Sequence, residues 1–169
     1  MEKQYTNKLT PEVLAEFAQS PFSAEDLAAM DDEARARVAE SDDYSRRHPV
    51  TAIWRHAVVG SLTRNGGTVS SASSGGKIIT SSGKMAGMAL VGDQVTYPDG
   101  SSARIISGAG YSHQYGVRGF VLVGSKLDNG DDIISTPQNI SLLTACEGIP
   151  MADDFLVAVT LETDAGGKR

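Results

Sequence analysis

Long hydrophobic runs, cysteine and aromatic residues are all scarce in this chain of 169 residues. No apolar run approaches the ~18 residues that a membrane-spanning helix needs, and the start lacks the basic-then-apolar order of a signal peptide. The sequence therefore predicts a protein without stable membrane insertion, which stays in the cytoplasm unless another machine exports it. The single cysteine, Cys146, excludes an internal disulfide framework.

Composition and charge narrow the class of protein further. Aromatic residues make up 6% of the chain, whereas glycine occurs 18 times, and this balance favours a turn-dense β fold over a helical bundle. The net charge of −6 is uneven: residues 1–45 hold eleven acids and four bases, and the rest is close to neutral. This acidity argues against nonspecific nucleic-acid binding, and the change in charge near Ser45 indicates a boundary.

Patterns of catalytic residues are missing as well. No serine stands in a Gly-x-Ser-x-Gly elbow. Gly75-Gly76-Lys77 lacks both the glycine spacing and the hydroxyl of a phosphate loop. The acid pairs Asp131-Asp132 and Asp153-Asp154 fall in expected turns, where solvation explains them. The sequence thus predicts no catalytic or cofactor-binding residues and no enzyme; a small hydrolase that depends on His113 or Cys146 is the alternative.

The strong nitrogen and sulfur donors are few, namely His48, His56, His113 and Cys146. Together they could satisfy one tetrahedral zinc, but no two of them have the short spacing of a zinc motif. His113 lies between two tyrosines, a setting typical of a surface or turn residue, and a lone cysteine is usually a free, buried one. We expect no metal, with zinc held by His113 and Cys146 as the alternative.

A repeat is the strongest feature that the chain does contain. Val58-Val59-Gly60-Ser61, Leu90-Val91-Gly92-Asp93 and Leu122-Val123-Gly124-Ser125 recur at an interval of 32 residues. A polar turn and a short apolar run follow each phrase, and a fixed period of this size indicates stacked or symmetrically arranged units. The glycine in each phrase predicts a sharp bend or bulge. One such hairpin cannot bury its apolar face alone, but three around a pseudo-threefold axis can.

The repeat also resembles a known family. Gly87-Met88-Ala89-Leu90-Val91-Gly92-Asp93, followed by Ile105-Ile106-Ser107-Gly108, is similar to PAAR-repeat proteins, and residues 60–69 fit the family's opening phrase. The resemblance covers residues 57–140. It implies a small cone of three pseudo-repeated β-hairpins that caps the trimeric β-helical spike (VgrG-type) of type VI secretion systems and related contractile injection systems. One copy per trimer would sharpen the spike for membrane puncture and effector delivery. The protein would be exported with the spike, without a signal peptide, to the extracellular space or a target cell.

The chain departs from that family at two kinds of position. The family often ties its apex with a zinc held by His and Cys in the turns, whereas Asn65, Tyr97, Asp99 and Asn129 stand there in this sequence. Two of the three Gly-Asp phrases have also become Gly-Ser. The resemblance therefore implies no zinc ligands at these turn positions.

A short α-helical extension is expected before the repeats. Thr10-Pro11 and Ser23 have the residue types that begin helices. Helices this short have marginal stability in isolation. We therefore expect them to dock on the β domain or to serve as an adaptor that recruits effector cargo or a chaperone. Residues 1–9 read as a free polar start, and Phe155 to Leu161 as a closing strand. The expected organisation is an acidic helical extension (1–45), a linker and entry strand (46–56), a PAAR-like repeat domain (57–145), and a closing strand with a polar tail (146–169).

Overall fold

The structure, a computed structural model, describes residues 2–161 and consists of two compact units. Unit 1 comprises residues 2–7, 54–143 and 151–161, and unit 2 comprises residues 8–53 and 144–150. Over the described residues the protein is mainly β with three short α-helices, so the coarse fold class predicted from the sequence is confirmed. No helix in this part of the chain has the length and apolar character to cross a membrane.

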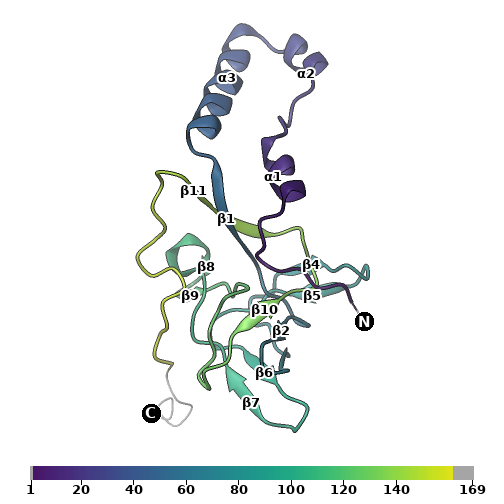
Figure 1. Ribbon diagram of the computed structural model, residues 1–169, viewed down its shortest axis with the longest axis vertical. Coiled ribbons are helices and arrows are strands. Elements are labelled where there is room, and N and C mark those ends of the chain that lie inside the picture. Colours follow the sequence, from purple (N-terminus) through teal and green to yellow (C-terminus); the bar gives the residue numbers. More distant parts are fainter. Residues whose placement is uncertain (1, 162–169) are drawn as a thin grey trace. The chain divides into compact units, whose positions relative to one another are not determined.

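Figure 1 labels most of these elements along the chain. The helices are α1 (Pro11–Ala18), α2 (Ala24–Ala29) and α3 (Asp32–Arg47), with a 3-10 turn η1 (Gly110–Ser112). The strands are β1 (Val50–Arg55), β2 (Leu62–Thr63), β3 (Thr68–Val69), β4 (Lys77–Ile79), β5 (Met85–Gly87), β6 (Gln94–Thr96), β7 (Ser102–Arg104), β8 (Gln114–Tyr115), β9 (Arg118–Gly119), β10 (Ile133–Ser135) and β11 (Leu142–Cys146).

Two of the three helices of unit 2 begin where the sequence predicts. The Thr10 side chain accepts a hydrogen bond from the first turn of α1, and Ser23 forms a capping box with Asp26 at α2. The segment that follows Ser23 forms two helices, because Met30 ends α2 and Asp31 caps α3. None of the three helices contains a buried residue. Local capping therefore defines these helices, and they lack a packed core of their own.

Unit 1 is organised around three backbone hydrogen bonds that close a ring. The amide of Ala57 donates to the carbonyl of Val121 (2.9 Å), Val121 donates to Ala89 (2.9 Å), and Ala89 donates to Ala57 (3.1 Å). These residues are 32 positions apart, the interval of the repeated phrases. The next bonds outward follow the same interval. The amide of Val59 donates to the carbonyl of Gly87, and the amides 32 and 64 positions after Val59 make the equivalent bonds. The ring uses the residue directly before each phrase in the same way.

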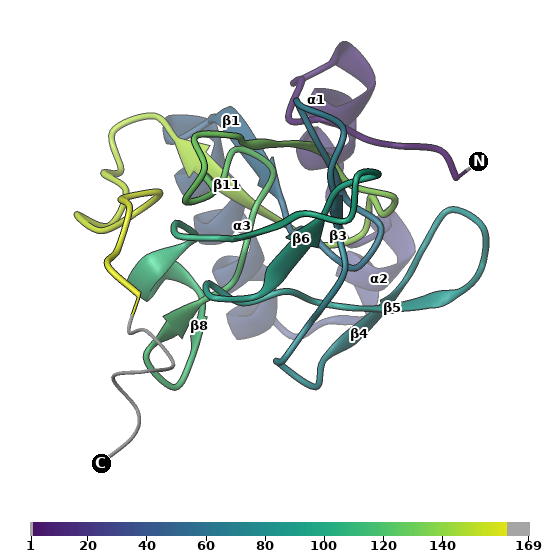
Figure 2. The same cartoon turned by 90° about the horizontal axis from the view of Figure 1, so that it is seen from below.

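The hairpins that follow the three phrases are joined edge to edge. Antiparallel pairing gives the strand order β10-β2-β3-β6-β7, and Figure 2 shows β3 and β6 side by side at the centre of the unit. An isolated bridge between Ile105 and Leu127 continues the pairing from the end of β7 to the third hairpin, and a bridge between Lys126 and Asp132 lies within that hairpin. Since β10 pairs back with β2, each hairpin is bonded to both of the others.

Apolar side chains from the ring and the hairpins form one core. The hairpins contribute Val69, Val95, Ile105, Leu127 and Ile133, each at most 2% exposed. Ala57, Ala89 and Val121 of the ring belong to the same cluster. Burying one aliphatic side chain of this size contributes about 1.5–3 kcal/mol, so each hairpin depends on its neighbours for most of its stability.

The chain ends differ from their expected states. Tyr5 pairs with Thr136 through both backbone bonds (2.8 and 2.9 Å), so the prediction of a free polar start is wrong for this part of unit 1. Phe155 to Leu161 forms no strand; single backbone bonds from Leu156 to Gly108 and from Val159 to Ile106 hold it instead. The expected polar tail from Thr163 onward lies outside the described residues.

Candidate functional site

The three repeat glycines supply the sharp bends expected of them. Gly60, Gly92 and Gly124 have φ angles of 100°, 99° and 104°, a region that L side chains avoid. Each glycine amide donates to the returning strand of its own hairpin, at 3.0, 2.7 and 2.8 Å respectively. The glycines therefore turn the chain from the ring into the hairpin at three equivalent points.

The residue after each glycine closes the bend from inside. Ser61, Asp93 and Ser125 are buried, and each side-chain oxygen accepts the amide of the residue three positions earlier, at 3.0, 2.7 and 3.0 Å. Serine and aspartate make the same contact because both have a side-chain oxygen that can accept the backbone amide three positions earlier. The change from Gly-Asp to Gly-Ser in two phrases thus preserves the bend.

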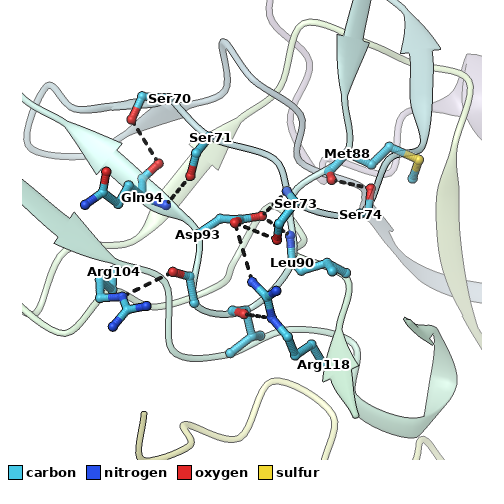
Figure 3. A network of polar contacts seen from close by, with 12 residues as sticks. Ser70, Ser71, Ser73, Ser74, Met88, Leu90, Asp93, Gln94, Arg104 and Arg118 are labelled. Carbon is cyan, nitrogen blue, oxygen red and sulfur yellow. Dashed lines mark hydrogen bonds and ion pairs between the residues drawn. The ribbon is translucent and has the colours of Figure 1, made fainter. Parts of the chain in front are cut away.

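Asp93 makes further bonds that its two serine counterparts do not (Figure 3). Its carboxylate accepts from the amide and the hydroxyl of Ser73, at 3.0 and 2.8 Å, and lies 3.4 Å from Arg118 Nη2. Ser73 belongs to the segment before β4, and Arg118 to β9. The second phrase therefore fixes two of the segments that are inserted between hairpins.

Polar side chains at the hairpin ends meet around Asp131. The Tyr97 hydroxyl donates to Asp131 Oδ2 (2.6 Å), the Asn129 amide donates to that hydroxyl (3.0 Å), and the Asn65 backbone amide donates to Asp131 Oδ1 (3.1 Å). These residues come from all three hairpins. Asp99 stays apart and accepts from its own turn at Ser101. Three of the four turn positions singled out in the sequence are thus joined by hydrogen bonds.

Asp131 is only 1% exposed, so the prediction of a solvated acid is wrong for this residue. Burial alone would raise the pKa of Asp131, but hydrogen bonds from Thr63, Tyr97 and neighbouring amides outweigh it and lower the pKa. Burial raises the pKa of Tyr97, and the hydrogen bond to Asp131 adds to the effect. Asp131 is therefore an ionised acceptor and Tyr97 a neutral donor at neutral pH.

His113 makes a contact that the sequence did not predict. Its Nδ1 lies 2.7 Å from Nε2 of His56, whose Nδ1 lies 2.8 Å from the Ser141 hydroxyl. The His113 ring also stacks on Phe120, with ring centroids 4.0 Å apart. Burial, with His56 only 2% exposed, lowers the pKa of His56 to about 4, and the charge of His113 adds to the effect. Both rings are thus neutral near pH 7, since burial lowers the pKa of His113 as well.

The alternative zinc pair is divided between the two units. His113 belongs to unit 1, and Cys146, half-buried at the end of β11, belongs to unit 2, where its sulfur lies 4.0 Å from the Thr144 hydroxyl. Within residues 2–161 no group of three or more His, Cys, Asp or Glu side chains is placed to hold a metal ion. The His56–His113 pair offers two nitrogen donors, which is fewer than a structural zinc site uses.

Comparison of the chain with family models, with curated proteins and with solved structures finds no match in any of the three.

Proposed function

We propose that this protein is a non-enzymatic tip protein that caps a trimeric β-helical spike. In this proposal the three pseudo-repeated hairpins of unit 1 form a small cone of the PAAR type, and one copy sits on each trimer. The spike and its tip belong to a contractile injection system such as a type VI secretion system. The protein stays in the cytoplasm before firing and leaves the cell with the spike, so it needs no signal peptide.

The ring of hydrogen bonds between Ala57, Ala89 and Val121 is the observation that carries this proposal. In this proposal, a single chain that repeats the same backbone contacts at intervals of 32 residues presents equivalent strand edges three times around an axis. A symmetric trimer presents its own features three times in the same way, so one copy of this chain can satisfy all three subunits. Strand ends left open on the spike are the groups that such a cap would pair with.

The edge-to-edge hairpins suit a part that carries mechanical load. Each hairpin bonds to both neighbours, and the Tyr97–Asp131–Asn65 contacts join the hairpin ends through side chains. A force on one hairpin is therefore passed to the other two through hydrogen bonds rather than through a flexible connection. Compactness of this kind is what puncture of a membrane requires of a tip.

The test is co-purification with the trimeric spike protein encoded nearest to this one, followed by the mass of the complex. A mass of one copy per trimer is expected. Replacing residues 9–47 with a short Gly/Ser linker keeps residues 2–7, which belong to unit 1, and should leave the complex intact. Deleting residues 57–140 should abolish it. Absence of a complex at micromolar concentrations of the intact proteins contradicts the proposal.

A second candidate is an adaptor that recruits effector cargo or a chaperone through α1–α3. It is favoured by helices without any buried residue that leave Leu14, Phe17 and Phe22 about 40% exposed. Mobile helices that become ordered when a partner is added, seen by NMR of the full chain, would support this role. Substituting Leu14 and Phe17 by serine should then abolish that ordering while spike binding is unchanged.

A further inference from the structure

Unit 1 contains a surface cavity of about 630 Å³ next to the second repeated phrase. Apolar side chains line much of it, from Val91, Val117, Val157, Val159 and Leu161. Arg104 and Arg118 reach the same cavity from β7 and β9. A volume of this size, mainly apolar with a few convergent polar groups, is typical of a binding site.

The two arginines are held by neighbouring carbonyl groups. Arg118 Nε donates to Val91 O (2.8 Å), and Arg104 Nε donates to Gly92 O (3.2 Å); Figure 3 shows both contacts. Each guanidinium is thus anchored through Nε, and Arg118 Nη2 also contacts Asp93 at 3.4 Å. Within the described residues, no acceptor contacts the terminal nitrogens of Arg104. The two guanidinium groups are therefore fixed by the carbonyls of two neighbouring residues of the second phrase, Val91 and Gly92.

The acidic groups near the cavity are already engaged. Asp93 receives the amide of Leu90 and two bonds from Ser73, so its 3.4 Å contact with Arg118 is its longest. Asp154, the acidic residue in the lining, accepts the Tyr111 backbone amide at 3.0 and 3.1 Å. An incoming carboxylate can therefore bond to Arg104 and the free side of Arg118 without displacing a stronger partner.

Exposed apolar side chains surround the cavity on the β8–β9 side. Val117 is 96% exposed and Tyr111 78%, and both line the cavity, while Tyr115 on the same hairpin is 62% exposed. Tyrosine and arginine are the residue types that dominate the binding energy at protein interfaces. A rim of this extent is wider than a small molecule needs, which favours a polypeptide as the occupant.

We infer that this cavity binds an extended segment of a partner protein that carries an acidic side chain between apolar ones. The carboxylate is bound by Arg104 and Arg118, and the flanking apolar side chains pack against Val117, Val157 and Val159. Two guanidinium groups in an acidic chain are too few for a nucleic-acid backbone, and the apolar rim suits a peptide. The inference goes beyond the proposed function and holds whether or not unit 1 caps a spike.

The test is an NMR titration of the full-length, ¹⁵N-labelled protein with two matched peptides. The first is acetyl-Ala-Leu-Val-Glu-Val-Leu-Ala-amide, and the second has Gln in place of Glu. We expect saturable shifts at the amides of Gly92, Gly108 and Gly119 with the Glu peptide, and at least fivefold weaker binding of the Gln peptide. N-acetylglutamate alone should bind at least tenfold more weakly than the Glu peptide.

Variants separate the cavity from the rest of the surface. R104Q/R118Q should weaken binding of the Glu peptide at least fivefold and remove the preference over Gln. Val117→Ser changes a fully exposed side chain, so it cannot unfold the protein through lost packing, and it should weaken binding about threefold. Arg64→Gln, an arginine paired with Asp132 at the hairpin ends, is the control and should bind normally.

The inference is overturned by no saturation at 2 mM peptide, by equal affinity for the Glu and Gln peptides, or by shifts confined to residues outside the cavity. Binding of N-acetylglutamate as tight as that of the peptide would also overturn it, because the site would then be one for small carboxylates. Spike binding is measured separately, so failure here leaves the proposed function unaffected.

Discussion

Protonation of His56 is expected to weaken unit 1 at mildly acidic pH. The ring is buried between Ser141 and His113, and burial lowers its pKa from 6.5 to about 4. In the unfolded chain the ring keeps the ordinary value, so between these two pH values the unfolded state binds more protons. Stability is therefore complete above pH ~6.5 and falls as the pH decreases towards ~4. A pKa difference of about 2.5, at about 1.4 kcal/mol for each pH unit, gives a total loss of about 3.5 kcal/mol when His56 is protonated in both states.

The assay is urea unfolding at pH 7.5 and 4.5, followed by the fluorescence of Trp54. This is the single tryptophan of the chain, and it packs edge-on against Phe155 within unit 1, so it reports on this unit. His56→Met removes the titrating ring, and methionine is the residue that the repeat places 32 positions later, at Met88. The variant should lose stability at pH 7.5, because the Ser141 contact is gone, but its stability should change by about 2.5 kcal/mol less than that of the wild type between pH 7.5 and 4.5.

Carboxylates elsewhere also respond to acid, so the difference between wild type and variant is the quantity that matters. His48→Gln, in unit 2, serves as the control and should keep the wild-type pH dependence of the Trp54 signal. If His56→Met and wild type lose the same free energy between the two pH values, to within about 0.5 kcal/mol, the argument from burial is refuted.

Three further substitutions test the ring and the hairpin ends by urea unfolding. Gly60→Ala should lower the free energy of unfolding by about 1–2 kcal/mol because φ is 100° there. Gly76→Ala should be nearly neutral, because Gly76 is not among the glycines with positive φ and a Cβ added there would lie at least 3.5 Å from its nearest neighbour. Equal effects of the two substitutions would contradict this reasoning. Tyr97→Phe should lower the free energy of unfolding by about 1.5–3 kcal/mol, because a buried carboxylate loses a hydrogen-bond donor. Tyr115→Phe, at an exposed position, should change it by nothing measurable. A neutral Tyr97→Phe would refute the role of the hydroxyl. Asp93→Ser should keep the bend and lose the contacts to both inserted segments, for about 1–3 kcal/mol, and wild-type stability would show those contacts to be unimportant.

Local signals in the sequence predicted the local features of the structure. Glycine is the residue that tolerates a φ near 100°, so Gly60 and its two counterparts marked the bends correctly. The helix starts at Thr10 and Ser23 followed from side chains that bond to amides three positions away. Such features depend on neighbours along the chain, and a single sequence contains them.

Contacts between distant residues could not be predicted in the same way. His56 and His113 are separated by 57 positions, and neither has a neighbour that indicates a histidine partner. Asp131 was expected in water because its sequence neighbours are turn residues, yet Tyr97 from another hairpin covers it. In each case the three-dimensional packing of segments decided the environment. The 32-residue repeat suggested that such segments meet, but it did not specify which side chains do.

The closed ring has a consequence for how the chain folds during synthesis. Ala57 bonds to both Ala89 and Val121, so the ring stays incomplete until the third phrase leaves the ribosome. Until then, the first two hairpins have unpaired edges. The last step of ring closure forms the bond between Ala57 and Val121, which are 64 positions apart. Long-range closure of this kind is slow and exposes edges to other nascent chains. A chain that stalls before Val121 has emerged from the ribosome would therefore be an aggregation-prone intermediate, whereas a chain that stalls after Ser135 has emerged can already have its three hairpins joined.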